Sequence, residues 1–368
     1  MVQFTVVADD GSPVEAVAKL SLRHGKPLLG KTDEQGYLRF RSGTSGVDAK
    51  DVRQLAVEPM QPGYRCVLLG TEVCEDCRVV LPRLPSPTSP WWLRVLGDVG
   101  KPGHGEGIRV GVVDGSRSRL DDLDVSSVAM PFVKQTLLSE ARSHASAVCA
   151  LLCAVAPSAT VLHVDVSRGT RKPQIAGTTS AIYGFLAEHP VDILSLSLGS
   201  PVHQGLADAI RLANEEGVVT VVAGGNDAAS HPAFPASMPE CVAVGALGQV
   251  RGAARPSLAA WYESRSNHRG AKDCLDGSSV ELYHWPESNL NVDYVAPGVV
   301  EVGGFDFAGT SFAAPLVAGV IAAMLTRKEL DAVTKGERRE YVLGELQSIS
   351  EKIAGLPASV VGAGLPVV

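Results

Sequence analysis

The chain of 368 residues lacks an excess of positive charge, because 33 lysines and arginines face 40 aspartates and glutamates, a formal net charge of −7. Nucleic acids and anionic membranes require a basic face, so we expect neither as a partner. The chain also lacks an apolar run that could cross a bilayer, since the longest candidate, residues 145–157, is too short. Its first ten residues have no basic region, long apolar core or cleavage site, and we interpret them as a strand rather than a signal peptide.

Cysteine is scarce: the chain has seven, an odd number scattered over its length. Such a set does not predict a disulfide framework, and a reducing cytoplasm is the location we expect. Cys66 and the Cys-Glu-Asp-Cys run at 74–77 offer three thiolates of the kind that bind zinc. A structural zinc site normally has four ligands in paired arrangements, however, and no second Cys-Xaa-Xaa-Cys occurs. We therefore predict ordinary reduced cysteines and no metal site.

Residues 1–83 have the composition of a small all-β domain, because short runs rich in Val, Leu and Phe alternate with turn clusters. The best strand candidates are 2–7, 14–22 and 37–40. This spacing predicts a small antiparallel β-sandwich. The Gly-Ser-Pro-Val run at 11–14 and the Lys-Thr-Asp-Glu-Gln-Gly-Tyr-Leu-Arg-Phe run at 31–40 resemble the carboxypeptidase-regulatory-like β-sandwich modules. That resemblance implies a structural or docking role rather than chemistry.

A proline-rich linker at 84–90 is predicted to separate this domain from residues 91–368. In the second part, apolar strand candidates lie at 108–113, 160–166, 192–198, 218–223 and 241–246. Helical stretches lie between them at 143–154, 175–188 and 206–216. Apolar strands separated by helices predict an α/β fold with a parallel sheet covered on both faces. Site residues are then expected at the carboxyl ends of the strands.

The run Gly-Thr-Ser-Phe-Ala-Ala-Pro-Leu-Val-Ala-Gly at 309–319 combines a tight turn, a hydroxyl nucleophile and the start of an apolar helix. Unpaired N–H groups and the helix dipole favour an anion beside Ser311. On its own, such a serine is more often a cap before a core helix. The whole run resembles the nucleophile motif of the subtilisin-like serine proteases (subtilases), from which it departs at Phe312 and Leu316, where Met and His are usual.

Two upstream residues resemble the acid and the base of that family. Asp114 ends the apolar run 108–113, although an Asp-Gly pair alone indicates a turn. His144 opens a helical stretch, although a lone histidine there is also explained as the cap of a core helix. The resemblance implies that His144 accepts the proton of Ser311 while Asp114 holds its other ring nitrogen. Both neighbourhoods depart from the family pattern: Asp-Gly-Ser replaces Asp-Ser/Thr-Gly, and His-Ala-Ser-Ala replaces His-Gly-Thr-His.

The Val-Val-Ala-Gly-Gly-Asn run at 221–226 follows the same resemblance, although Gly-Gly-Asn alone indicates a turn. It implies that Asn226 donates its side-chain amide to the oxyanion, together with the backbone N–H of Ser311. It also implies a strand that binds the substrate backbone by β-augmentation, and small S1 walls that favour an uncharged P1 residue. The substrate-binding residues implied in this way are Ser197, Leu198, Gly199, Ala223, Gly224, Gly225 and Ala233.

Residues 249–292 fit no part of the resemblance. Their periodicity is poor, and we predict a long surface insertion or lid. The two histidines in this segment, His268 and His284, are predicted to face solvent rather than to bind a metal.

The order Asp114, His144, Asn226, Ser311 is that of the subtilases and differs from the order in chymotrypsin-like enzymes and α/β-hydrolases. The resemblance implies a subtilisin-like serine endopeptidase that forms an acyl-enzyme on a dedicated peptide or protein substrate without a cofactor. Subtilases often bind structural calcium, but no acidic cluster identifies ligands here. Two alternatives stay open: a subtilase-fold peptide-binding module without activity, and an N-terminal domain that inhibits the site as a prosegment or docks a partner.

Overall fold

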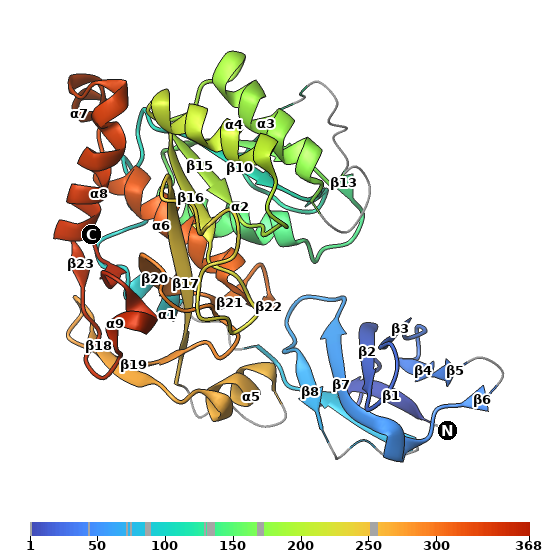
Figure 1. Cartoon of the computed structure of the whole chain (residues 1–368). Helices are drawn as coiled ribbons and strands as arrows, with labels where there is room; N and C mark the ends of the chain where they lie inside the picture. The colour runs from blue at the N-terminus through green and yellow to red at the C-terminus, as the bar shows by residue number, and fades with distance from the viewer. Residues whose placement is uncertain are drawn as a thin grey trace.

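The computed structural model describes residues 2–42, 45–70, 73, 76–84, 90–128, 130, 137–167, 173–250 and 257–368. Buried apolar side chains form two clusters, one drawn from residues 2–81 and the other from residues 91–365. We call residues 2–84 the N-terminal unit and residues 90–368 the main unit; the former is blue in Figure 1. The domain limits drawn from the sequence stay a prediction, and residues 85–89 of the linker lie outside the described residues.

The N-terminal unit is β-rich, as the sequence predicts, and its described residues form sheets with the orders β4-β1-β9 and β3-β2-β7-β8 and a two-stranded pair, β5-β6. The strands are β1 (Gln3–Ala8), β2 (Ala16–Leu22), β3 (Leu28–Lys31), β4 (Tyr37–Arg39), β7 (Val52–Pro59), β8 (Val67–Leu69) and β9 (Asp76–Leu81), with a short β5 (Arg41–Ser42), β6 (Ser45–Gly46) and η1 (Ala49–Asp51) between β4 and β7. The prediction of a purely antiparallel arrangement is wrong for one pair, because β1 and β9 run parallel. The chain crosses from one sheet to the other between β8 and β9, and β9 runs in the direction of β1.

The main unit is built on a sheet with the order β12-β14-β10-β15-β16-β17-β19-β18, with β20 also paired to β17. The strands are β10 (Arg109–Asp114), β12 (Ser126–Ser127), β14 (Thr160–Asp165), β15 (Ile193–Leu196), β16 (Val219–Ala223), β17 (Cys241–Gln249), β18 (Arg269–Asp273), β19 (Ser279–His284) and β20 (Tyr294–Pro297). The part from β12 to β17, with β20, is parallel throughout. Every residue of β15 and β16 is buried, as expected for a parallel sheet covered on both faces.

Helices cover both faces of this sheet, α3 and α4 on one and α2 and α6 on the other (Figure 1). Their bounds are α2 (His144–Val155), α3 (Ile175–Ala187), α4 (Gln204–Glu215) and α6 (Thr310–Met324), and a short α1 (Trp91–Arg94) precedes the sheet. α2 and α6 pack closely, because a Cβ on Gly319 would come within 2.8 Å of the Cβ of Val155. This contact fixes α2, which begins at His144, against α6, which begins one residue before Ser311.

The segment predicted as an insertion or lid has regular structure. It contains α5 (Leu258–Arg265) and the β18–β19 hairpin, and β19 pairs antiparallel with β17, so the segment extends the central sheet and makes it mixed. The prediction that both histidines face solvent is wrong for His284, which is 6% exposed. Burial, followed by the neighbouring His268, lowers the pKa of His284 to about 4. A role as a lid stays a prediction, and residues 251–256 lie outside the described residues.

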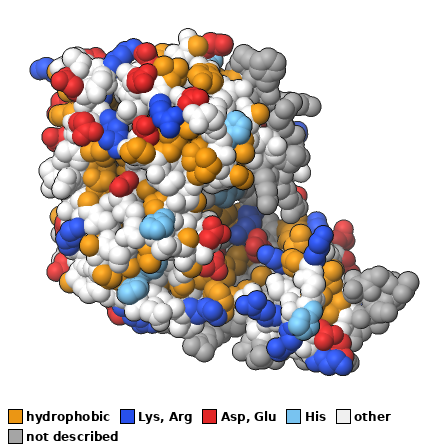
Figure 2. Space-filling model, in the orientation of Figure 1, with side chains coloured by type: hydrophobic (Ala, Val, Ile, Leu, Met, Phe, Trp, Pro, Cys, Tyr) orange, Lys and Arg blue, Asp and Glu red, His pale blue; other side chains and the backbone are white. Residues whose placement is uncertain are grey.

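The hairpin of β21 (Val299–Val302) and β22 (Phe305–Ala308) leads directly into α6. The remaining short elements are β11 (Arg117–Ser118), β13 (Leu137–Leu138), α7 (Arg327–Ala332), η2 (Lys335–Glu337), α8 (Arg338–Ser348), β23 (Ser350–Glu351), α9 (Ala358–Val361) and β24 (Leu365–Pro366). On the face seen in Figure 2, the surface is hollowed where the N-terminal unit meets the main unit. Within the described ranges, no helix combines the length and the apolar character needed to cross a membrane.

Candidate active site

Asp114 and His144 form a hydrogen-bonded pair at the carboxyl end of β10. The Nδ1 of His144 lies 2.9 Å from Oδ1 and 3.0 Å from Oδ2 of Asp114. The aspartate is 2% exposed, whereas the side chain of His144 is 43% exposed. Because Asp114 occupies Nδ1, the other ring nitrogen is left to face a substrate or a nucleophile. The strand carries the acid and the first turn of α2 carries the imidazole.

The environment of His144 makes it a stronger base than a free imidazole. Burial lowers its pKa, but the charge and the hydrogen bond of Asp114 raise it, and the net pKa lies above the ordinary histidine value. The imidazole ring also packs against Phe312, with 5.0 Å between the ring centroids. Phe312 therefore supports the ring from α6, at the position next to Ser311.

The unusual Asp-Gly-Ser order after β10 is accommodated by a second buried carboxylate. Gly115 donates its N–H to Oδ1 of Asp114 at 2.6 Å. The hydroxyl of Ser116 donates to Asp165 at 2.7 Å, and its carbonyl accepts from the hydroxyl of Ser143 at 2.8 Å. Asp165 ends β14 and is paired in register with Asp114. The departure from the family pattern thus still leaves the Asp114 carboxylate turned toward His144.

The first turn of α2 is held by hydroxyl groups. Ser143 caps the helix by accepting the N–H of Ser146 at 3.2 Å. The hydroxyl of Ser146, which stands where the family has Thr, donates to the carboxylate of Asp121. Asp121 in turn forms a buried ion pair with Arg117 at 2.6 Å. These contacts fix the helix start that carries His144.

Ser311 lies in the first turn of α6, with its hydroxyl donated to the carbonyl of Ser197 at 3.3 Å. The hydroxyl of Ser197 donates back to the carbonyl of Ser311 at 2.6 Å. Pro315 explains why that carbonyl is available, because proline has no N–H to donate to the residue four positions earlier. Within the described residues, no hydrogen bond joins Ser311 to His144. Such bonds are often absent from enzymes without a substrate and form in the complex.

Asn226 is oriented by Thr310. Its Oδ1 accepts the backbone N–H of Thr310 at 3.0 Å and the hydroxyl of Thr310 at 2.7 Å. An N–H group can only donate, so the oxygen of the amide must face Thr310 and the NH2 group is free to donate elsewhere. Within the described part of the chain, the N–H of Ser311 has no hydrogen-bond partner. Two donors, Asn226 Nδ2 and the N–H of Ser311, are therefore available at the start of α6.

Asn289, which the sequence did not single out, supports the loop that carries Asn226. Its Oδ1 accepts the N–H groups of Asp227 and Ala229, each at 3.0 Å, and its own N–H donates to the carbonyl of Gly225 at 3.1 Å. It is 1% exposed. Its signal in the sequence is a polar pair, Ser-Asn, a few residues before an apolar strand. The segment has poor periodicity, which predicts a surface insertion, and that prediction hides the buried role of Asn289.

The residues predicted to bind substrate come from three segments that lie together. Ser200 donates its N–H to the carbonyl of Phe234 at 2.9 Å, and Ala233 donates to the carbonyl of Gly224 at 2.8 Å. Among the described residues, neither Leu198 nor Gly199 uses its backbone in a hydrogen bond. These bonds join the three segments that contain the predicted substrate-binding residues, Ser197, Leu198, Gly199, Ala223, Gly224, Gly225 and Ala233. An extended peptide has free backbone partners at 198–199.

Metal binding finds no support among the described residues, which contain no group of three or more His, Cys, Asp or Glu side chains placed to hold an ion. The six cysteines in the described ranges are thiols outside any disulfide. Cys74 of the three-thiolate alternative lies outside the described residues.

Comparisons with known proteins identify the family and the fold. A family model described as Subtilase family matches residues 138–344. The chain is 28% identical over 240 residues to alkaline elastase YaB of Bacillus sp. (strain YaB), covering 61% of this chain and 55% of that protein. It is 27% identical over 234 residues to subtilisin BL of Lederbergia lenta, covering 61% of this chain and 78% of that protein. It is 28% identical over 191 residues to the major intracellular serine protease of Bacillus subtilis (strain 168), covering 48% of this chain and 50% of that protein.

Among solved structures, the chain resembles one described as a cold adapted subtilisin-like serine proteinase, with a TM-score of 0.54 and 20% identity over 76% of this chain and 97% of that one. At this identity the likeness concerns the fold. The chain spans about half the length of two of the curated relatives, 55% of the alkaline elastase and 50% of the intracellular protease.

Proposed function

The chain belongs to the subtilase family, and from this premise we propose that it is a serine endopeptidase whose acid, base and nucleophile are Asp114, His144 and Ser311. The observation that carries the proposal is the Asp114–His144 pair, 2.9 Å apart, whose imidazole packs against Phe312, the residue next to Ser311. A pair of this kind is what activates a serine hydroxyl in acyl transfer.

The reaction begins when a bound peptide draws the Ser311 hydroxyl away from the Ser197 carbonyl and toward Nε2 of His144. The Ser311 oxygen forms a bond to the scissile carbonyl carbon while His144 takes the hydroxyl proton. Asp114 keeps the imidazole in the tautomer with its proton on Nδ1 and balances the charge of the imidazolium. His144 then gives the proton to the leaving amine as the C–N bond breaks, and an acyl-enzyme remains on Ser311. Water then gives a proton to His144 and bonds to the acyl carbon, and His144 passes that proton to the Ser311 oxygen as the ester C–O bond breaks and the carboxylic acid leaves.

The negative charge that develops on the substrate oxygen is stabilised at the start of α6. Asn226 donates its NH2 group and Ser311 its backbone N–H, and the positive end of the α6 dipole adds to both. Thr310 fixes the direction of the Asn226 amide before the substrate arrives. Donors that are already oriented need no reorganisation when the charge appears, and this preorganisation supplies much of the catalytic effect.

The substrate class we propose is an extended peptide or protein segment. Its backbone pairs with residues 197–199, whereas residues 223–225, whose backbone groups bond within the protein, lie beside the P1 side chain. The proposed walls of the S1 pocket, Ala233 and the segment Ala223–Gly225, are small and uncharged and favour an uncharged P1 side chain. We further propose a cytoplasmic enzyme that acts on one dedicated substrate without a cofactor. Profiling of cleavage sites in a proteome tests this last point, since broad degradation without preferred sites contradicts it.

Hydrolysis of a fluorogenic peptide by the full chain tests the enzymatic proposal. Ser311→Ala and His144→Ala are each expected to abolish turnover, whereas Ser200→Ala, which removes only a hydroxyl that donates to the carbonyl of Pro201, should keep the rate of the parent. A parent chain that binds peptides yet turns over none of them supports the alternative, a subtilase-fold peptide-binding module.

A further inference from the structure

One segment of the N-terminal unit, residues 63–67, is hydrogen-bonded into the main unit. Gly63 donates its N–H to the carbonyl of Gly304, between β21 and β22, at 2.7 Å. Leu258 at the start of α5 donates to the carbonyl of Cys66 at 2.8 Å. The N-terminal unit is thus joined by its backbone to the hairpin that runs directly into α6.

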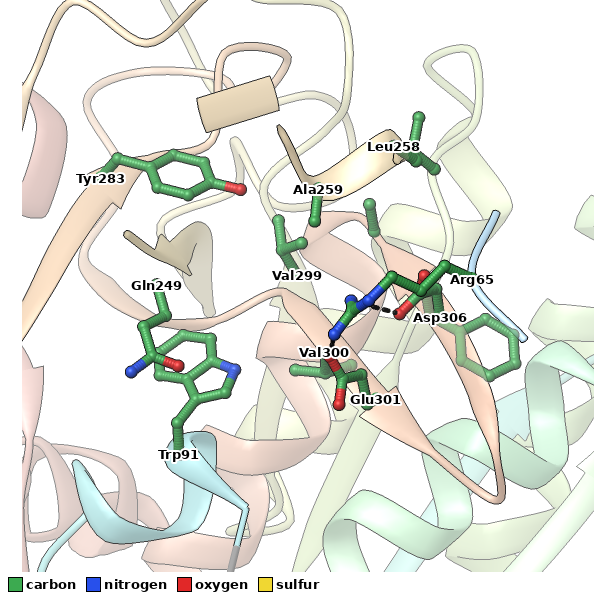
Figure 3. A pocket seen from close by; sticks show the side chains of 12 residues that line it. Arg65, Trp91, Gln249, Leu258, Ala259, Tyr283, Val299, Val300, Glu301 and Asp306 are labelled. Atoms are coloured by element: carbon green, nitrogen blue, oxygen red, sulfur yellow. Dashed lines mark hydrogen bonds and ion pairs between the residues drawn. The ribbon is translucent and has the colours of Figure 1, made fainter. Parts of the chain in front are cut away.

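Buried charges are paired across this junction (Figure 3). The guanidinium of Arg65 points into the β21–β22 hairpin and contacts Glu301 at 2.9 Å and Asp306 at 3.4 Å. Both Arg65 and Asp306 have side chains that are only 10% exposed. The other carboxylate oxygen of Asp306 accepts the N–H of Cys66 at 3.2 Å. Charges this well buried remain paired only while the two units stay together, because an unpaired buried charge is costly.

Arg142, two residues before His144, connects the junction to the candidate site. Its Nη2 donates to the carbonyl of Asp306 at 2.9 Å, and its Nη1 donates to Sγ of Cys66 at 3.3 Å. Its Nε lies 3.7 Å from the carboxylate of Glu58, which also belongs to the N-terminal unit. The side chain of Arg142 is 21% exposed. One guanidinium therefore touches both the N-terminal unit and β22.

A row of aromatic rings continues from Arg142 to the imidazole. The guanidinium lies over the ring of Phe307, 4.7 Å from its centroid. The Phe307 ring packs on Phe312 with 4.9 Å between centroids, and Phe312 packs on His144 with 5.0 Å. His144 is thus held from two directions that both lead to Arg142, along the backbone and through the rings.

We propose that Arg142 is a positioning residue through which the N-terminal unit holds His144 in its working orientation. The N-terminal unit is then a permanent part of the enzyme, and not a prosegment that must be removed before the site can act. This inference rests on the proposed function. It assigns Arg142 no contact with substrate, since its guanidinium is engaged by Asp306, Cys66 and Glu58.

The test measures kcat, KM and the rate of labelling by a fluorophosphonate probe on the full chain. Arg142→Met should lower kcat and the labelling rate about 10- to 100-fold, with KM changed much less, because a small displacement of a catalytic group is costly. Arg142→Lys keeps the charge over Phe307 but loses the two-donor fork, and should fall between Met and the parent. Cys66→Val changes only the N-terminal unit, and should lower kcat about 2- to 5-fold by removing one acceptor of the guanidinium. Arg211→Met, on the outer surface of α4, is the matched control and should behave as the parent.

Several results overturn the inference. Parent values of kcat and labelling in Arg142→Met, with only a lower midpoint of thermal unfolding, show a structural role alone. If that variant does not fold, parent values in Arg142→Lys and Cys66→Val lead to the same conclusion. A labelled chain whose intact mass lacks the N-terminal unit also contradicts the proposal. A parent chain that the probe never labels contradicts the proposed function instead, and that result is seen before any variant is compared.

Discussion

Thr310 donates both its backbone N–H and its hydroxyl to Oδ1 of Asn226, at 3.0 and 2.7 Å, and so turns the amide NH2 group outward. We expect Asn226→Ala to lower kcat on the order of 100- to 1,000-fold, the usual cost of one oxyanion donor. Thr310→Val removes only the hydroxyl and should lower kcat about tenfold, while Thr310→Ser should stay near the parent. Steady-state kinetics on a peptide check both, and equal rates for Thr310→Val and the parent contradict the orienting role.

Asn289 offers a second test of the same loop. Asn289→Ala leaves the N–H groups of Asp227 and Ala229 without their acceptor and should lower the free energy of unfolding by about 1–3 kcal/mol for each buried group left unpaired. Because the loop carries Asn226, kcat should fall as well. Asn289→Asp keeps an acceptor oxygen and should recover most of the stability. Denaturant unfolding and kinetics measured on the same preparations decide this, and a loss of stability with an unchanged kcat rules out a role in positioning the loop.

The rate should depend on the protonation of His144. Asp114 raises the pKa of the imidazole above its ordinary value, against the opposite effect of burial, and only the neutral form accepts the proton of Ser311. We therefore expect kcat/KM to rise with pH through an inflection above about 6.5, the value of a free histidine. In Asp114→Asn the residual activity should show an inflection at lower pH. An unchanged inflection in that variant means that Asp114 does not act on His144.

The pH dependence of stability should reveal Asp306. Burial raises its pKa to about 6, although Arg65 lowers it and Glu301 raises it further, so the folded chain holds this proton more tightly than the unfolded chain. The stabilising contribution is therefore complete below the unfolded pKa near 3.8 and is lost as the pH rises toward 6. It amounts to roughly 3 kcal/mol. In Asp306→Asn, the difference in unfolding free energy from the parent should change over this range and be flat above it; a constant difference from pH 4 to 8 contradicts the assignment.

The parallel sheet was predictable because each of its main strands has a local signal. Apolar runs such as 108–113 and 218–223 end in polar or small residues, and the fold then brings those ends to one edge of the sheet. The same local patterns place His144 and Ser311 at helix starts. These features depend on a few neighbouring residues, and so a single sequence contains them.

What the sequence did not reveal depends on partners far away along the chain. β19 is part of the sheet through its pairing with β17, and β9 pairs parallel with β1, a strand about 70 residues earlier. Asn289 matters through amides some 60 residues earlier. Arg142 has no local signal, since its partners Cys66 and Asp306 lie 76 and 164 residues away.

Covalent capture of the nucleophile tests the central claim most directly. The full chain, treated with a fluorophosphonate probe and digested for peptide mass spectrometry, should carry a single adduct on Ser311. The adduct should be absent from Ser311→Ala and formed far more slowly in His144→Ala. An adduct on another residue, or no adduct over a range of pH in a folded chain, contradicts the assignment of Ser311 as the nucleophile.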